Sequence, residues 1–148
     1  MLKHLHPSTK EAAIEVASNL LPADYNELVD GYGVDPMIVI PQYIKEGDHV
    51  YFKTPSGKTA AIGGVSTTDQ LWMMSTPAVY ECPKLFLRET KRWVDSRPNK
   101  LLWNLVDKRN VKHLKYLKYL GCKFLREVTY GPNNITFIEF CKIPCTQY

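Results

Sequence analysis

The first third of the chain repeats apolar residues with the period of amphipathic helices. Ser8 followed by Glu11 forms a capping box, which predicts that a helix begins at Ser8. Pro22 favours the first turn of a second, shorter helix, which we expect to end by Gly33. A first strand over Leu2–Leu5 is expected ahead of both helices. The apolar positions that carry the first helical repeat are Ala12, Ala13, Val16, Ala17, Leu20 and Leu21.

The middle of the chain has the pattern of a three-stranded meander followed by a long helix. His49–Thr54 alternates apolar and polar residues, a turn follows, and Thr59–Val65 returns, which predicts a hairpin. Leu71–Ser75 is the expected third strand. A helix is predicted over Ala78–Asp95, where apolar residues again recur at helical spacing. The segment 33–47, interrupted by prolines and glycines, is left unassigned.

The last third predicts a strand, a helix and a closing hairpin. Leu101–Val106 is almost continuously apolar, as a strand covered on both faces would be. A helix follows over Asn110–Leu120, and Phe124–Tyr130 and Ile135–Ile143 form the hairpin. The predicted order is therefore β-α-α-β-β-β-α-β-α-β-β. This order favours a three-layer α/β/α domain with a mixed central sheet, extending over residues 1–148 as one domain.

Composition narrows the class of protein. The 148 residues are 45% hydrophobic and 23% charged, which is typical of a folded domain. No apolar run approaches the roughly 20 residues that span a bilayer, and the first residues do not resemble a secretory signal, so we expect neither membrane insertion nor secretion. The four cysteines include no C-x-x-C pair and the four histidines are scattered, so no metal site is predicted.

Charge is distributed unevenly along the chain. The segment from Lys84 to Tyr130 contains 13 Lys and Arg against 4 Asp and Glu, whereas the rest of the chain is acidic overall. An anionic partner is therefore expected to bind the second half. A basic helical face of Lys108, Lys112 and Lys115, extended by Lys118 and Arg126, is one candidate surface for nucleic acid. The candidate stacking groups beside it are Trp93, Trp103 and Tyr116.

The order of elements and several local motifs resemble the Gcn5-related N-acetyltransferase (GNAT) superfamily over nearly the whole chain. The strand Leu102–Val106, then Asn110, then a helix ending in Leu120-Gly121 and followed by Phe124 is a GNAT-like sequence. Further motifs resemble a family of small GNAT-like internal virion proteins of short-tailed bacteriophages. These motifs are Ala61-Ile62-Gly63-Gly64, Asp69-Gln70, Trp72, Leu102-Trp103-Asn104, Val106, Asn110, His113, Leu117-Lys118 and Gly121.

This resemblance implies an acyl-CoA-dependent transfer of an acetyl group to an amine of unknown identity, with acetyl-CoA as the cofactor. The residues implied at the cofactor are Met73, Met74 and Ser75, whose backbone would pair with the pantetheine arm, and Lys84, Arg88, Asn110 and Lys112. Tyr116 is the candidate acid that protonates the leaving thiolate, with Glu81 or Asp107 as the candidate base.

Two departures from the GNAT pattern make catalysis uncertain. GNAT enzymes hold the cofactor pyrophosphate on N–H groups of a glycine-rich loop, but no glycine lies between Gly64 and Gly121. The corresponding segment, Thr76–Lys84, contains two prolines without N–H groups, and Glu81 adds a negative charge. The tyrosine usual seven residues after the helix-capping asparagine is replaced by Leu117, and Tyr116 lies about 100° away around the helix.

An alternative is therefore a non-catalytic internal virion protein that uses the GNAT scaffold for assembly, DNA packing or ejection. Its partners would be other virion proteins or packaged DNA, and its location the host cytoplasm or the virion interior. This alternative predicts an exposed apolar patch for a partner. The candidate patch is Tyr32, Met37, Ile38, Val39, Ile40, Tyr43 and Ile44.

Overall fold

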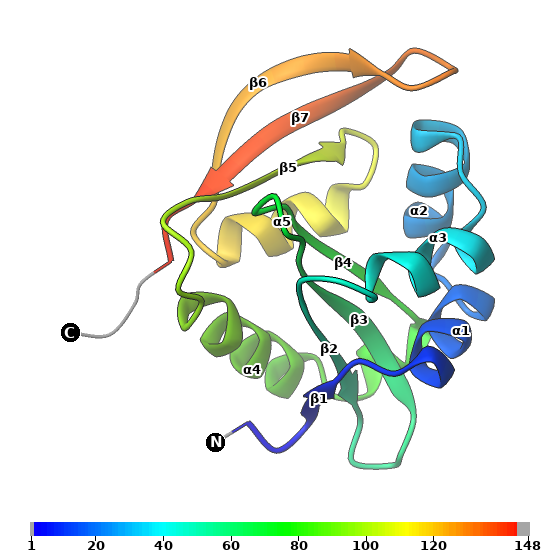
Figure 1. Cartoon of the computed structure of the whole chain (residues 1–148), viewed down its shortest axis with the longest axis vertical. Coiled ribbons are helices and arrows are strands. Elements are labelled where there is room, and N and C mark those ends of the chain that lie inside the picture. Colours follow the sequence, from blue (N-terminus) through cyan, green and yellow to red (C-terminus); the bar gives the residue numbers. More distant parts are fainter. Residues whose placement is uncertain (1, 145–148) are drawn as a thin grey trace.

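The computed structural model describes residues 2–144, which form two small sheets with helices on both sides (Figure 1). The elements of the first half are β1 (Leu5–Pro7), α1 (Lys10–Ser18), α2 (Pro22–Asn26), the π-helical segment η1 (Glu27–Tyr32), α3 (Pro36–Tyr43), β2 (Asp48–Lys53), β3 (Thr59–Val65) and β4 (Leu71–Ser75). Those of the second half are the 3₁₀ segment η2 (Pro77–Glu81), α4 (Pro83–Asp95), β5 (Leu102–Asp107), α5 (Val111–Tyr119), β6 (Lys123–Tyr130) and β7 (Ile135–Lys142).

Every strand pair within the two sheets is antiparallel. The first sheet has the order β1-β2-β3-β4 and the second the order β5-β7-β6. The two sheets meet where Gln70, just before β4, forms a single parallel bridge with Trp103 in β5. The mixed character predicted from the sequence is therefore confined to this one junction.

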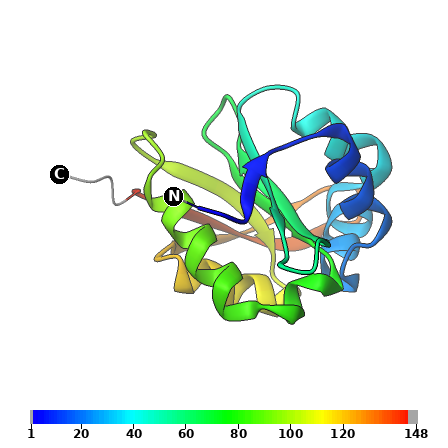
Figure 2. The ribbon, with the colours of Figure 1, turned by 90° about the horizontal axis from the view of Figure 1, so that it is seen from below.

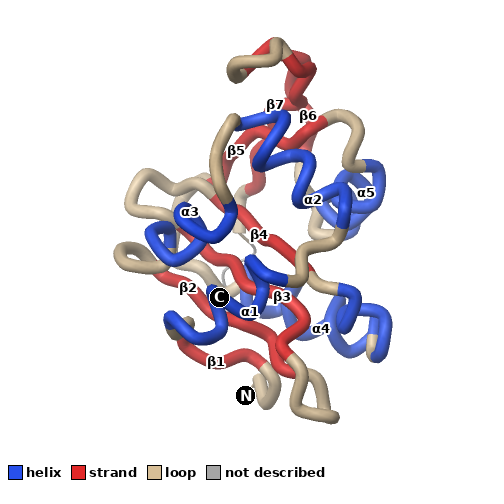
Figure 3. Tube along the Cα trace, turned by 90° about the vertical axis from the view of Figure 1, so that its right-hand side faces the viewer, coloured by secondary structure: helices blue, strands red, loops and turns tan. Residues whose placement is uncertain are grey.

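Helices cover both faces of the first sheet, which confirms the expected layers. Ile62 and Met74 are buried against residues of α1, η1 and α3. Figure 3 shows α1 and α3 on that side of the sheet. Val65 and Leu71 point to the other face, against Trp93 of α4 and the core residues of α5. Figure 2 shows α4 and α5 side by side on that second face. The alternation of side chains along each strand separates the two cores.

The closing hairpin rests on the first half of the chain. The turn between β6 and β7 contains Gly131 in a left-handed conformation, at φ 79°, and its Cα approaches the backbone carbonyl of Gly31 in η1. A side chain at Gly131 would collide with that carbonyl. The rings of Tyr32 and Tyr130 also meet edge to face, with centroids 5.6 Å apart. The hairpin therefore closes one end of the space between the sheets.

Several predicted boundaries are corrected. The cap of α1 is Thr9, whose hydroxyl accepts from the N–H of Ala12, because Ser8 is held to β2 by its backbone bond to His49. The first strand lies at Leu5–Pro7 instead of Leu2–Leu5. The helix predicted over Ala78–Asp95 is split: Pro83 has no N–H to continue a helix from η2, so α4 begins there.

The unassigned segment contains a helix, α3, because Pro36 occupies its first turn and Asp35 caps it through the N–H of Met37. Met37, Ile38 and Tyr43 are exposed, whereas Ile40 is fully buried against α1. The apolar patch expected in this segment is therefore present in part. Among residues 2–144, no helix combines the length and the apolar character that crossing a bilayer requires.

Candidate functional site

Beyond their single bridge, β4 and β5 diverge and leave two hollows between the sheets. One cavity, of about 480 Å³, lies between β4, η2, α4 and α5. The second, of about 290 Å³, lies on the other side, between β4, β5, η1 and the β6–β7 hairpin. Met73 and His113 line both cavities. The two strands therefore form a V-shaped opening.

The N-terminus of α2 occupies the edge of β4 that faces this opening. The backbone N–H of Ser75 donates to Asp24 Oδ2 at 2.9 Å, and the Ser75 carbonyl accepts from the N–H of Leu21 at 2.9 Å. Backbone N–H and C=O groups alternate between the two edges of a strand, so the backbone groups of Met73, two residues before Ser75, point to the same edge as those of Ser75. Ser75 therefore has both of its outward backbone groups bound within the chain.

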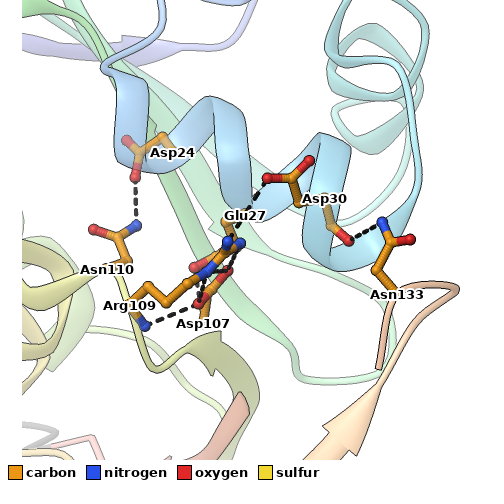
Figure 4. A network of polar contacts seen from close by, with 7 residues as sticks. All are labelled: Asp24, Glu27, Asp30, Asp107, Arg109, Asn110 and Asn133. Carbon is orange, nitrogen blue, oxygen red and sulfur yellow. Dashed lines mark hydrogen bonds and ion pairs between the residues drawn. The ribbon is translucent and has the colours of Figure 1, made fainter. Parts of the chain in front are cut away.

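Carboxylates of α2 and η1 link the two sheets across the opening (Figure 4). Asp24 also accepts from Asn110 Nδ2 at 2.8 Å, at the start of α5. Glu27 accepts from the backbone N–H of Asp107, at the end of β5, at 2.9 Å. Both carboxylates are buried, with exposed fractions of 4%. These bonds join β4, β5 and α5 to one short helical segment.

The electrostatics of this buried cluster are dominated by desolvation. Burial raises the pKa of Glu27 from 4.5 to about 7, although the nearby His113 opposes that shift. Burial alone lowers the pKa of His113, but the facing carboxylates of Asp24 and Glu27 outweigh it, so its net shift is upward. Nδ1 of His113 lies 3.9 Å from Asp24 Oδ1 and has no hydrogen-bond partner among the described residues.

The smaller cavity has aromatic walls. Tyr32 and Tyr130 face it from η1 and β6, and Tyr43 and Trp72 face it as an edge-to-face pair with centroids 5.3 Å apart. Glu27 lines the same cavity. Aromatic faces beside a carboxylate form a suitable environment for an ammonium group.

The segment expected to hold the cofactor pyrophosphate has few free donors. In η2, the N–H of Ala78 donates to Thr76 Oγ1 and the N–H of Val79 donates to the Thr76 carbonyl. Pro77 and Pro83, which begin η2 and α4, have no N–H. Two N–H groups of η2 are therefore bound locally, and two positions of the segment have none to offer a diphosphate.

Of the residues predicted at the cofactor, Met73, Ser75, Asn110 and Lys112 line the larger cavity. Met74 lines the smaller cavity instead, and its side chain is buried in the core beneath α1. Lys112 reaches across the mouth of this cavity and bonds to the hydroxyl of Tyr80, with its Nζ 4.4 Å from the ring centroid. Lys84 and Arg88 are exposed on α4 and do not line this cavity.

The three predicted catalytic residues are not brought together. Tyr116 lines the larger cavity beside Phe86, with ring centroids 5.9 Å apart, and burial raises the pKa of its phenol above 10. Glu81 instead forms an ion pair with Lys58 at 2.9 Å, on the β2–β3 turn, and lines neither cavity. Asp107 is buried and bound to Arg109, whose Nη2 lies 2.8 Å from its carboxylate.

Sequence reasoning missed Asp24 and Glu27. Both lie in a short helical segment where acidic side chains normally face solvent, so no local pattern marks them. His113 was noticed only as part of the family resemblance. Among the described residues, no group of three or more His, Cys, Asp or Glu side chains is arranged to hold a metal ion.

Solved structures place this fold among the GNAT acetyltransferases. A GNAT-family acetyltransferase from Bacillus cereus superposes with a TM-score of 0.67 at 13% identity, covering 97% of each chain. The ribosomal-protein-S18-alanine N-acetyltransferase from Escherichia coli gives a TM-score of 0.66 at 13% identity, over 97% of this chain and 94% of that one. A putative phosphinothricin N-acetyltransferase gives 0.67 at 12% identity, over 97% and 98%. At these identities the likeness defines the fold.

The family itself is defined by sequence. A family model described as "Bacteriophage T7, probable scaffold protein Gp13" matches residues 50–129, which is more than half of the chain. The chain belongs to this phage family. A search of curated proteins found no match.

Proposed function

We propose that this chain is a structural protein of phage assembly that uses the acetyltransferase fold without transferring acetyl groups. The name of its family, a probable scaffold protein, supports a structural role. The proposal places the chain among other virion proteins, in the host cytoplasm during assembly or inside the particle.

The observation that carries the proposal is the contact between α2 and β4. In a GNAT enzyme, the outward edge of this strand pairs with the pantetheine arm of the cofactor. Here the N–H and the carbonyl of Ser75 are bound to Asp24 and Leu21. A cofactor amide would have to break both bonds and leave the Asp24 carboxylate buried without one of its donors, which costs about 1–3 kcal/mol or more.

The phosphate end of the cofactor meets a second obstacle. η2 offers few free N–H groups to a diphosphate, and the exposed cations Lys84 and Arg88 do not line the cavity. Lys112 and Arg109, which do line the cavity, are already bound to Tyr80 and to Asp107 respectively. Acetyl-CoA would therefore depend mainly on apolar contacts.

Acetyl transfer is the second candidate, and the two cavities that meet at Met73 and His113 favour it. An acetyl-CoA thioester would enter the larger cavity along Met73–Ser75, near Asn110 and Lys112. An amine would enter the smaller cavity, where Glu27 and the aromatic walls suit an ammonium group. Tyr116 would protonate the leaving thiolate. The base assignments to Glu81 and Asp107 are the weakest part of this candidate, because both carboxylates are bound to cations.

Calorimetric titration with acetyl-CoA separates the two candidates. We expect no saturable heat up to about 1 mM acetyl-CoA, corresponding to binding weaker than about −4 kcal/mol. A GNAT enzyme titrated in the same cell serves as the positive control, and circular dichroism verifies that the chain is folded. Micromolar affinity would overturn the proposal, and Tyr116→Phe would then be assayed for turnover, since an unchanged rate removes the acid role of Tyr116.

A further inference from the structure

The outer surface of α4 carries an unbroken row of basic side chains. Lys84, Arg88 and Arg92 follow one another at four-residue spacing, and all three are exposed. Because residues four apart share one side of a helix, the three charges lie on one side of α4, opposite the buried Phe86 and Trp93. The row is about 12 Å long at 1.5 Å per residue.

The acidic residues of α4 do not offset this row. Glu89 is 7% exposed and accepts from the backbone N–H of His4 at 3.0 Å, on the inner side of the helix. Asp95 is bound to Lys91 at 2.9 Å and to the buried Lys142 at 3.0 Å. Neither carboxylate is available to neutralise the outward charges.

The neighbouring helix α5 adds to the same surface. It contains no acidic residue, and Lys115 and Lys118 are exposed on its outer side. The two helices touch through the rings of Phe86 and Tyr116 and lie side by side over the same face of the sheet (Figure 2). We define the basic face as Lys84, Arg88, Arg92, Lys115 and Lys118. Within residues 2–144, none of the five forms an ion pair.

Two basic residues that the sequence places near this surface are already paired with carboxylates. Lys108 is paired with Glu127 at 2.7 Å and Arg126 with Glu139 at 3.0 Å. Two of the three candidate stacking groups face inward, because Trp93 is buried and Tyr116 packs against Phe86. Single strands are usually bound through such stacking platforms, whereas a duplex presents its phosphates to a basic surface.

We propose that the basic face binds the phosphate backbone of duplex DNA without reading its sequence. A stretch of duplex about 12 Å long carries about seven phosphate charges, counting both strands, and only some of them face a surface on one side. Five unpaired cations on a surface of this size match that charge. The inference goes beyond the proposed function and does not depend on it, since an active transferase would present the same surface.

Salt dependence gives the first test. Fluorescence anisotropy of a labelled duplex of about 20 base pairs is measured between about 50 and 200 mM NaCl. If five phosphates are neutralised, the logarithm of the affinity falls with the logarithm of salt at a slope of about −4.5, an affinity loss of about 500-fold over that range. The absence of binding at 50 mM NaCl would overturn the proposal.

Matched variants locate the surface. A triple variant removes three charges from the basic face: Arg88→Gln, Lys115→Gln and Lys118→Gln. With two cations left, the slope of log affinity against log salt should flatten to about −1.8, so that raising NaCl from about 50 to 200 mM weakens binding only about 12-fold. Lys10→Gln, Lys45→Gln and Lys53→Gln combined remove three exposed charges elsewhere and should leave slope and affinity within about twofold. Equal losses in the two triple variants would refute the assignment to this face.

Two further measurements distinguish DNA from an acidic protein partner, and this inference from the proposed function. Competition by poly-glutamate as strong as by unlabelled duplex would overturn the choice of DNA, because an acidic protein segment would then fit equally well. Acetyl-CoA is titrated separately. A chain that binds both DNA and acetyl-CoA would contradict the proposed function alone, and a chain that binds neither would contradict this inference alone.

Discussion

Asp24 accepts a hydrogen bond from the backbone N–H of Ser75 at 2.9 Å, so a helix side chain occupies the strand edge that faces the opening between the sheets. The same carboxylate accepts from Asn110 Nδ2 at 2.8 Å and faces the ring of His113. One buried residue therefore satisfies donors on β4 and on α5. This is the reason why we regard α2 as part of the site and not as a surface helix.

Asp24→Ala should destabilise the fold substantially. The substitution leaves the Ser75 N–H and the Asn110 amide buried without acceptors, at about 1–3 kcal/mol each, so we expect a loss of about 2–5 kcal/mol in the free energy of unfolding. Asp35→Ala is the matched control, because it removes an exposed helix cap and should cost about 1 kcal/mol. Urea denaturation measures both. A loss at Asp24 no larger than at Asp35 would contradict the linking role.

Glu27 should make stability depend on pH near neutrality. Its pKa is raised by burial from 4.5 in the unfolded chain to about 7 in the folded protein. The stability contributed by this group is therefore fully present below about pH 4.5 and is lost as the pH rises toward 7. The loss amounts to about 3 kcal/mol, since one pKa unit corresponds to about 1.4 kcal/mol.

Glu27→Gln isolates this dependence, because an amide oxygen still accepts from the Asp107 N–H but does not titrate. The groups that face Glu27 are His113 of α5, Asp107 of β5 and Asp24 of α2. Relative to wild type, the variant should gain stability as the pH rises from about 4.5 to 7, measured by urea denaturation at several pH values. The exposed Glu46→Gln is the control. Curves that stay parallel for Glu27→Gln and wild type would show that Glu27 is not desolvated.

Gly131→Ala and Gly57→Ala should differ, although both glycines have positive φ. The values are 79° and 92°, so both substitutions cost about 1–2 kcal/mol of backbone strain. A Cβ at Gly57 meets nothing within 4 Å, whereas one at Gly131 collides with the carbonyl of Gly31. We therefore expect Gly131→Ala to cost at least about 1 kcal/mol more, in line with other overpacking substitutions. Equal losses in thermal denaturation would mean that the hairpin turn does not rest on η1.

Asp95→Ala should cost more than Asp48→Ala, although each removes one partner of an ion pair. Lys142, which pairs with Asp95 at 3.0 Å, has a side chain that is only 4% exposed, so its charge would be left buried. Such losses cost about 3–5 kcal/mol. Asp48 is 56% exposed, and its partner Arg97 keeps a hydrogen bond to the Trp93 carbonyl, so losing this pair should cost less, about 0–1 kcal/mol. Chemical denaturation checks the ranking, and the reverse order would contradict the burial of Lys142.

The strands were predictable because their patterns are local. Thr59–Val65 and Leu71–Ser75 have in the structure the bounds that apolar residues and flanking turns predict. The helix α3 was missed because Pro36 and Pro41 were interpreted as interruptions, whereas Pro36 only needs a first-turn position. Because a proline is compatible with the first turn of a helix, the preceding Asp35, as a potential N-cap, was the residue that marked the start of α3.

The candidate site was predicted less well than the fold. Asn110 and Tyr116 lie at the opening because the strand-helix motif that contains them is local. Asp24 could not be assigned, since its role depends on β4, which lies about fifty residues further along the chain. By contrast, the outward position of Lys84 and Arg88 was available from the sequence, because Phe86 and Trp93 fix the buried side of that helix.

The parallel bridge between Gln70 and Trp103 has a mechanical consequence. The described strands of the two sheets pair only at this point, and the buried carboxylates of Asp24 and Glu27 bind the sheets together a second time, through β4 and through β5. Tyr25, on the outer side of α2, is 48% exposed. Displacing α2 and η1 through this residue would break hydrogen bonds to β4, α5 and β5 at once.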